Sequence, residues 1–349
     1  MKKILVLICL LIPLKISAIS TSAKSAILMD MDSGRIFYAK NINSQQSVAS
    51  ISKILTAVVA IDNGNLKNKV TVGNEIKKAY GSGIYIKEGE KLTLQDLLYG
   101  LMLRSGNDAA LAIANNVSKN TKSFVKKMNE KAQELDMKNS LFRNPHGLDQ
   151  EDGGNISTAY DMAKLTSYAM KNKNFKKIVA TEKYTLKTNK NTYVWHNKNK
   201  LLYRYKYTTG GKTGFTKIAR RTLVTTASKN NLNLVVVTLN DGNDFTDHEN
   251  LFEYAFNNYT NYKILSKGFI KIKKENYYKK HKLYIKNDYN YPLSIDEKDS
   301  IRIKYQLKKI RKLKNNSKVG TAKIYFGDKL VHEENIYLKY SSKKSKGWF

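Results

Sequence analysis

Hydrophobic and polar positions along the first three quarters of the chain predict helices and short antiparallel strands. Residues 25–38, SAILMDMDSGRIFY, carry two apolar runs separated by the turn Asp32-Ser33-Gly34, which indicates a pair of strands. Apolar residues then fill 50–62 and predict a buried helix that ends at Asn63-Gly64. Further helices are expected at 97–103 (behind a capping-box variant at 93–96), 109–117, 121–135, 158–170 and 247–259. Extended segments are expected at 184–195, 201–207, 221–228 and 232–239. This alternation favours an α+β fold, with an antiparallel sheet flanked by helices.

The composition changes near Lys263, beyond which lysine is frequent and the apolar runs are short. Short β-rich pieces at 282–285, 301–305, 320–326 and 334–340 predict a small all-β domain. We therefore expect a mixed domain over 24–262, an all-β domain over 263–340 and a basic tail over 341–349.

The N-terminus has the pattern of a secretory signal peptide. Met1-Lys2-Lys3 precedes an apolar run over 4–14, and small residues follow at Ala18 and Ala23. The apolar run is shorter than the roughly 20 residues that a helix needs to cross a bilayer. We expect residues 1–23 to be a signal peptide, with cleavage near 18–23, and the mature protein to be exported. The single cysteine, Cys9, lies within it, so no disulfide or cysteine-based metal site is expected.

A formal net charge of +33 predicts attraction to polyanions. For an exported protein these are anionic wall polymers, the membrane surface and carboxylate-rich peptides, whereas the signal peptide argues against nucleic acid. A solvated lysine-rich surface without a partner is an equally weighted alternative. None of the histidines has the spacing of a metal pair, and His248-Glu249 lacks the second histidine of a zincin motif. We expect no metal and no cofactor.

Three short motifs supply the candidate chemistry. Ser50-Ile-Ser-Lys53 opens the first predicted helix, so its hydroxyl lies among unpaired backbone N–H groups and its lysine follows one turn later on the same face. Lys53 can act as a base only if its pKa falls, through burial or a nearby cation such as Lys212. Ser105-Gly-Asn107 lies between two predicted helices, where the hydroxyl could relay a proton and the amide could hold both the lysine and the substrate backbone.

The third motif, Lys212-Thr-Gly214, begins or edges a predicted strand. A lysine and a threonine hydroxyl can bind a terminal carboxylate, and glycine lets a substrate backbone approach the strand edge. The backbone N–H of Phe215 could join that of Ser50 in an oxyanion hole. Each motif alone is explained as well by a helix cap, a loop or a glycine turn, but the ordered set of three is not.

The set matches the S-x-x-K, S-x-N and K-T-G pattern of penicillin-binding proteins and class A β-lactamases. SAILMDMDSGRIFYAKN, IYIKEGEKLTLQDLLYGLMLRSGNDAALAIA, FRNPHGLD and GGKTGFT resemble the S11 family of D-alanyl-D-alanine carboxypeptidases, over residues 25–259. The resemblance implies peptidoglycan stem peptides as substrates, β-lactams as covalent inhibitors and a C-terminal β-sandwich, matched more loosely by residues 263–340. It also implies the following roles: Ser50 as acyl-ester nucleophile, Lys53 as proton acceptor, Ser105 as proton relay, Asn107 as substrate holder, and Lys212 with Thr213 as the site for the terminal D-alanine carboxylate.

Two other functions are left open by the sequence. A β-lactamase uses similar groups, but class A members carry a glutamate in an E-x-x-L-N string that this chain lacks, and they commonly have aspartate where Gly106 stands. A non-catalytic wall- or membrane-binding protein with relict motifs would suit the charge, although the intact motif set argues against it. The tail is too short for the amphipathic helix that often anchors the family, which leaves attachment in question. His146 is interpreted as a turn residue rather than a base.

Overall fold

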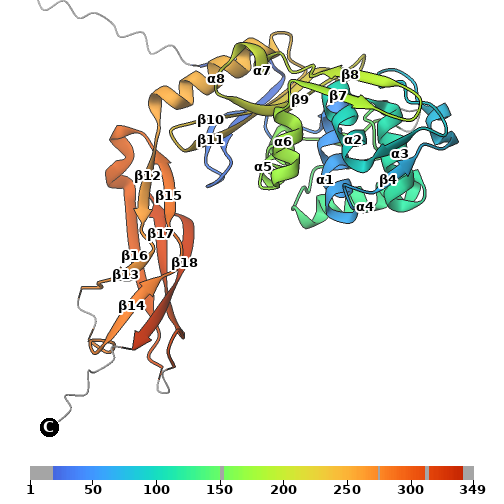
Figure 1. Cartoon of the computed structure of the whole chain (residues 1–349). Coiled ribbons are helices and arrows are strands. Elements are labelled where there is room, and N and C mark those ends of the chain that lie inside the picture. Colours follow the sequence, from blue (N-terminus) through green and yellow to red (C-terminus); the bar gives the residue numbers. More distant parts are fainter. Residues whose placement is uncertain (1–18, 150–152, 274–275, 311–313, 341–349) are drawn as a thin grey trace, which may run out of the picture.

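A five-stranded antiparallel sheet forms the centre of the N-terminal part of the molecule (Figure 1). The computed structural model describes residues 19–149, 153–273, 276–310 and 314–340. Because strand residues alternate between faces, Val235 and Val237 pack into the larger helical core, whereas Leu234 and Val236 pack beneath the helix α8 (Asp244–Asn258). The strands, in spatial order, are β2 (Ile36–Lys40), β1 (Ser25–Asp30), β11 (Leu232–Leu239), β10 (Arg220–Lys229) and β9 (Thr208–Thr216).

Helices cover both faces of this sheet. α8 (Asp244–Asn258) packs on β10 and β11 from one side, while α5 and α6 pack on the other side, next to the rest of the helical layer (Figure 1). That layer comprises α1 (Lys53–Asn63), α2 (Leu94–Tyr99), α3 (Asn107–Ser118), α4 (Thr121–Glu134), α5 (Ala159–Ala169) and α6 (Lys173–Ala180). The short helical turns are η1 (Ala49–Ser52), η2 (Asn74–Lys78), η3 (Gly100–Arg104) and α7 (Leu201–Arg204).

Three two-stranded pairs complete this part of the molecule. β3 (Gln46–Ser47) pairs with β6 (Ile156–Ser157), β4 (Lys69–Thr71) with β5 (Lys91–Thr93), and β7 (Lys183–Lys187) with β8 (Thr192–His196). The expected strand pair at 25–38 and the hairpin at 221–239 are present, as is the capping box at Thr93 and Asp96. The α+β architecture is therefore confirmed.

One local expectation is wrong, and one helix was not predicted. Residues 201–207 were expected to be extended, but α7 occupies Leu201–Arg204, because the side chain of Asn199 accepts the Leu201 backbone N–H at 3.2 Å and starts a helical turn. The sequence interpretation also missed α6, which begins where the Asn172 side chain accepts the N–H groups of Asn174 and Phe175. Asn172 is the N-cap of α6, whereas Asn199 lies one residue before the N-cap of α7, and in both cases an asparagine side chain accepts backbone N–H groups of the turn.

The C-terminal part is all-β, as expected. A five-stranded sheet packs its apolar face against a two-stranded sheet, with Leu265, Leu283 and Ile336 in the shared core. The larger sheet has the order β13 (Gly268–Ile270), β14 (His281–Ile285), β18 (Lys329–Tyr340), β17 (Lys318–Phe326) and β16 (Ile301–Leu307); the smaller one pairs β12 (Thr260–Leu265) with β15 (Tyr289–Leu293). A 3-10 turn, η4 (Ile295–Ser300), leads into β16. The domain boundaries at 262/263 and 340/341 stay predictions.

One arginine joins the two parts. Arg35, in the turn between β1 and β2, donates to the Pro292 carbonyl at 2.5 Å and pairs with Glu297 at 2.5 Å. Its guanidinium also lies over four aromatic rings from both parts, those of Phe37, Tyr259, Tyr291 and Phe326. This junction is mostly buried, since only 10 % of the Arg35 side chain is exposed.

Within the described ranges, no helix combines the length and apolar character needed to cross a bilayer. Most of the predicted signal peptide and the whole tail lie outside the described residues.

Candidate active site

Ser50 and Lys53 lie side by side at the start of α1. Ser50 sits in η1, a 3-10 turn directly before α1, rather than in the α-helix itself. The Lys53 ammonium donates to Ser50 Oγ at 3.1 Å, the contact that the three-residue spacing predicts. Lys53 is fully buried, although it carries an ionisable group, so its burial needs an explanation.

The buried ammonium of Lys53 has two further partners. It donates to Asn107 Oδ1 at 2.7 Å and to the backbone carbonyl of His146. These neutral acceptors do not balance its charge, and burial together with the cations Lys212 and Lys198 holds the pKa of Lys53 well below its usual value. The structure therefore places an amine of lowered pKa within hydrogen-bond distance of a serine hydroxyl.

Ser105 and Ser50 line one cavity, and the backbone of Ser105 has a left-handed conformation. The π-helical turn η3 ends at Ser105, whose φ of 64° lies in the left-handed region, and α3 begins two residues later at Asn107. This reversal brings Ser105 and Asn107 to one end of the cleft. Asn107 also donates through Nδ2 to the Tyr80 carbonyl at 2.6 Å, so its side chain is held from both ends.

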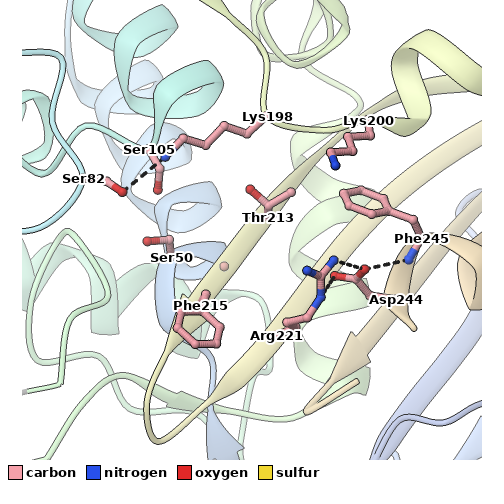
Figure 2. A pocket seen from close by; sticks show the side chains of 11 residues that line it. Ser50, Ser82, Ser105, Lys198, Lys200, Thr213, Phe215, Arg221, Asp244 and Phe245 are labelled. Carbon is pink, nitrogen blue, oxygen red and sulfur yellow. Dashed lines mark hydrogen bonds and ion pairs between the residues drawn. The ribbon is translucent and has the colours of Figure 1, made fainter. Parts of the chain in front are cut away.

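Asp108 fixes the loop that faces this motif. Its carboxylate accepts the backbone N–H groups of Ile84, at 3.0 Å, and Tyr85, at 2.7 Å. The N–H of Asn107 donates to the Ser82 carbonyl at 2.8 Å. Together these bonds place Ser82 on the cavity wall opposite Thr213 (Figure 2).

The third motif lies on β9, the edge strand of the central sheet. Gly214 allows close approach to the nucleophile's turn, since a Cβ at this position would lie 3.0 Å from the Ser50 backbone nitrogen. Thr213, Gly214 and Phe215 line the cavity. Lys212 is buried behind them, where its ammonium donates to the Thr213 carbonyl at 2.7 Å. Burial, and then the nearby Lys198, lowers the pKa of Lys212 to about 7.

The cavity has a volume of about 480 Å³ and opens between β9 and the helical layer (Figure 2). Its far wall is built from residues that the sequence interpretation did not single out. Lys198 donates to Ser82 Oγ at 3.2 Å across the opening. Arg221 forms a two-point ion pair with Asp244, with Nε–Oδ2 at 3.2 Å and Nη2–Oδ1 at 2.5 Å. Lys200 and Phe245 complete the lining.

Some of these residues left a signal in the sequence and others did not. Arg221 ends the basic stretch 217–221 of the sequence, and it lines the cavity. Ser82, Lys198 and Asp244 belong to no motif, and only the fold brings them there.

His146 contributes its backbone rather than its ring. Its Nδ1 accepts the Leu148 N–H at 3.2 Å within the turn, and burial next to Lys53 lowers the pKa of the ring to about 3. The ring is therefore neutral at physiological pH, which agrees with its interpretation as a turn residue. The His146 carbonyl, in contrast, accepts from the Lys53 ammonium.

Comparisons with known proteins agree with this geometry. The family model for D-alanyl-D-alanine carboxypeptidases, peptidase S11, matches residues 13–243, and the model for the C-terminal domain of penicillin-binding protein 5 matches residues 259–344. DacF of Bacillus subtilis, a D-alanyl-D-alanine carboxypeptidase, is 37 % identical over 227 residues, which cover 63 % of this chain and 58 % of DacF. DacC of Escherichia coli, also a D-alanyl-D-alanine carboxypeptidase, is 32 % identical over 263 residues, which cover 69 % of this chain and 63 % of DacC. Both matches thus span less than two thirds of the relative.

A solved structure matches nearly the whole chain. Penicillin-binding protein 5 from Haemophilus influenzae superposes with a TM-score of 0.76 at 26 % identity, and the match covers 92 % of this chain and 97 % of that one. It therefore includes both the mixed α/β part and the all-β part described above. The chain belongs to the D-alanyl-D-alanine carboxypeptidases of the S11 family of serine peptidases.

Proposed function

We propose that this chain is an exported serine carboxypeptidase that removes the terminal D-alanine from peptidoglycan stem pentapeptides. The observation that carries the proposal is the buried Lys53 ammonium, 3.1 Å from Ser50 Oγ, with its pKa lowered by burial and by Lys212. A lysine in this state can accept a proton from a serine at neutral pH. The family membership supplies the reaction class, and this pair of residues supplies its first step.

Acylation follows from the contacts of Ser50. Neutral Lys53 takes the hydroxyl proton as Ser50 Oγ forms a bond to the carbonyl carbon of the D-Ala–D-Ala peptide bond. The proton then passes, through Ser105, to the nitrogen of the departing D-alanine as the C–N bond breaks. Water attacks the resulting ester, the Ser50 oxygen leaves with a proton, and the shortened peptide departs as a carboxylate.

Two sites are proposed to stabilise negative charge, one for the oxyanion that develops in this step and one for the carboxylate of the terminal D-alanine. The backbone N–H groups of Ser50 and Phe215 form the oxyanion hole, which the close approach of Gly214 to Ser50 supports. The D-alanine carboxylate binds at the Thr213 hydroxyl, in front of Lys212, while Asn107 holds the substrate backbone. A bound carboxylate favours the charged form of Lys212 and so offsets the lowering of its pKa by burial.

Acylation by β-lactams is proposed for the same site, because these compounds present a strained amide beside a carboxylate to the same groups. The stem peptide and the β-lactam are therefore the expected partners of the cleft. The protein is expected to act outside the cytoplasm, at the cell wall or on the outer face of the cytoplasmic membrane. Anionic wall polymers or the membrane surface are the proposed partners of its basic surface. Because the proposed reaction trims the stem peptides of the wall, the protein is also proposed to influence cell shape.

The decisive experiment measures D-alanine release from a pentapeptide that ends in D-Ala-D-Ala. The parent protein should release D-alanine and be labelled covalently by a fluorescent penicillin, whereas Ser50→Ala should do neither and Lys53→Ala should lose release. Ser52→Ala is the matched control, because Ser52 belongs to the same turn but donates to the Ala49 carbonyl instead. Labelling of Ser50→Ala at the parent rate would show that another residue is the nucleophile. Rapid turnover of the penicillin, without release of D-alanine from peptide, would favour a β-lactamase.

A further inference from the structure

The outer face of the larger C-terminal sheet is rich in lysine and tyrosine. Paired strands place Lys282 opposite Lys339, Tyr284 opposite Tyr337, and Lys304 opposite Lys323. The residues between them point the other way, into the apolar core. We call this outward surface the lysine–tyrosine face; it consists of Phe269, Lys282, Tyr284, Arg302, Lys304, Lys318, Thr321, Lys323, Tyr325, Tyr337 and Lys339.

The positive charge of this face is largely unbalanced. Lys323 pairs with Glu333 at 3.1 Å and Arg302 pairs with Asp328 at 2.7 Å. Among the residues that the structure describes, no carboxylate lies within 4.0 Å of the ammonium groups of the remaining exposed lysines, Lys282, Lys304, Lys318 and Lys339. Lys282 and Lys339 lie directly opposite each other on neighbouring strands. Like charges in such a pair destabilise a sheet. A ligand with repeated negative charges would relieve this repulsion.

The aromatic rings lie against the sheet, beneath the lysines. The Lys304 ammonium is 5.2 Å from the centre of the Tyr325 ring, and the Lys286 ammonium is 4.0 Å from that of Tyr337. The tyrosines of the face are half-buried, and only Phe269 exposes much apolar surface. Contact with a bilayer interior needs protruding apolar side chains. A flat surface of cations and ring faces fits a soluble polymer better.

A hollow with a volume of about 460 Å³ lies over β16 and β17, at one side of the sheet. Its lining includes three lysines, one carboxylate and two neutral polar side chains: Lys308, Lys318, Lys323, Glu333, Gln306 and Thr321. Lys323 pairs with Glu333, so Lys308 and Lys318 are the cations of the hollow that have no carboxylate within 4.0 Å among the described residues. With Gln306 and Thr321 beside them, the hollow can accept an anionic group with hydroxyls next to it.

We propose that the lysine–tyrosine face binds a linear polymer in which phosphate diesters alternate with polyols. Phosphates pair with the unbalanced lysines, which act as point charges toward phosphate oxygens, and the polyol segments lie against the tyrosine rings and the hydroxyl of Thr321. Binding holds the catalytic part close to the wall in which such a polymer occurs. The inference rests on the export in the proposed function, but it is independent of the catalytic roles of Ser50 and Lys53.

The test measures binding of the full chain to fluorescent poly(glycerol phosphate) at several salt concentrations. The face variant carries Lys282→Gln, Lys304→Gln, Lys318→Gln and Lys339→Gln. It should bind at least about 10-fold more weakly. Its affinity should also depend less steeply on salt concentration, because binding through fewer lysine–phosphate contacts releases fewer counterions. The control variant removes the same charge from exposed lysines of α4 and α6, with Lys122→Gln, Lys126→Gln, Lys173→Gln and Lys176→Gln. It should bind within about twofold of the parent.

Three outcomes would overturn the inference. The parent could fail to bind the polymer, or both variants could lose the same affinity, which would make net charge alone responsible. Alternatively, phosphatidylglycerol vesicles could bind through this face without competition from the polymer, which would identify a membrane contact. D-alanine release from a soluble pentapeptide by the face variant should equal that of the parent. Loss of polymer binding with intact release thus separates this inference from the proposed function.

Discussion

Replacing Gly214 by alanine tests the contact between β9 and the turn that carries Ser50. The added Cβ would lie 2.4 Å from Thr222 Oγ1 and 3.0 Å from the Ser50 nitrogen, and atoms essentially never approach a Cβ more closely than 3.0 Å. Rotation of the buried Thr222 would break its 3.0 Å bond to the Val48 carbonyl. The simplest relief is a shift of β9 away from η1, which carries Thr213 away from Ser50.

The expected loss is larger in rate than in stability. Overpacking a buried contact by one methyl group costs about 1–3 kcal/mol of folding free energy. A displacement of about 1 Å between reacting groups lowers the rate roughly 10²-fold. We therefore expect Gly214→Ala to remain folded, with the rate constant for acylation by a labelled penicillin, and kcat/KM for D-alanine release, both reduced roughly 10²-fold.

Two further variants locate the effect. Gly242→Ala should behave as the parent, because a Cβ there has no neighbour within 4 Å. Combining Gly214→Ala with Thr222→Ala removes the shortest contact and should recover part of the rate, relative to Thr222→Ala alone. If Gly214→Ala acylates within twofold of the parent, the close approach of β9 to Ser50 is not required and the proposed oxyanion hole is wrong.

Two other predictions follow from the buried charges. Lys198→Gln removes a cation that lowers the pKa of both Lys53 and Lys212, so both pKa values should rise and the acidic limb of the kcat/KM profile should move to higher pH. Lys200→Gln, at the same cavity, should leave that limb in place; an equal shift in both variants would point to a general charge effect. Arg35→Ala should lower the free energy of unfolding by about 2–4 kcal/mol, because it leaves Glu297 unpaired and removes the contacts with four rings. Urea denaturation measures this, and Arg302→Ala, an exposed arginine paired with Asp328, should change it by less than about 1 kcal/mol.

The sequence predicts the parts of the site that depend on short-range geometry. A three-residue spacing brings Ser50 and Lys53 together in any helical turn, and their hydrogen bond follows from it. The glycine of the third motif predicts the close approach of a substrate backbone, which stays a prediction; the structure shows instead that Gly214 lies close to the backbone of the turn that carries Ser50. The convergence of Asn107 on Lys53 required the recognised pattern, because these residues lie 54 positions apart. The catalytic roles themselves stay predictions.

Other contacts of the site could not be predicted from the sequence, because they depend on the backbone or on loop structure rather than on a side-chain type. The Lys53 ammonium donates to the backbone carbonyl of His146, and any residue in that turn would offer the same acceptor. Ser82 reaches the cavity because Asp108 and Asn107 bind the backbone around it, so its position depends on a loop fold rather than on its own type. Lys198 likewise reaches the cavity from the short segment between β8 and α7, which carries no motif.

The pair of buried lysines ties the reactivity of the site to its stability. Lys212 has a pKa of about 7 in the folded protein and one near 10.5 when exposed, so the unfolded chain binds more protons between these values. Folding stability from this group is therefore fully present above pH 10.5 and is lost as the pH falls through about 7. The shift for Lys53 has the same direction and the same largest cause, burial. The burial that lowers the pKa of the amine beside Ser50 thus also lowers the stability of the fold near neutral pH.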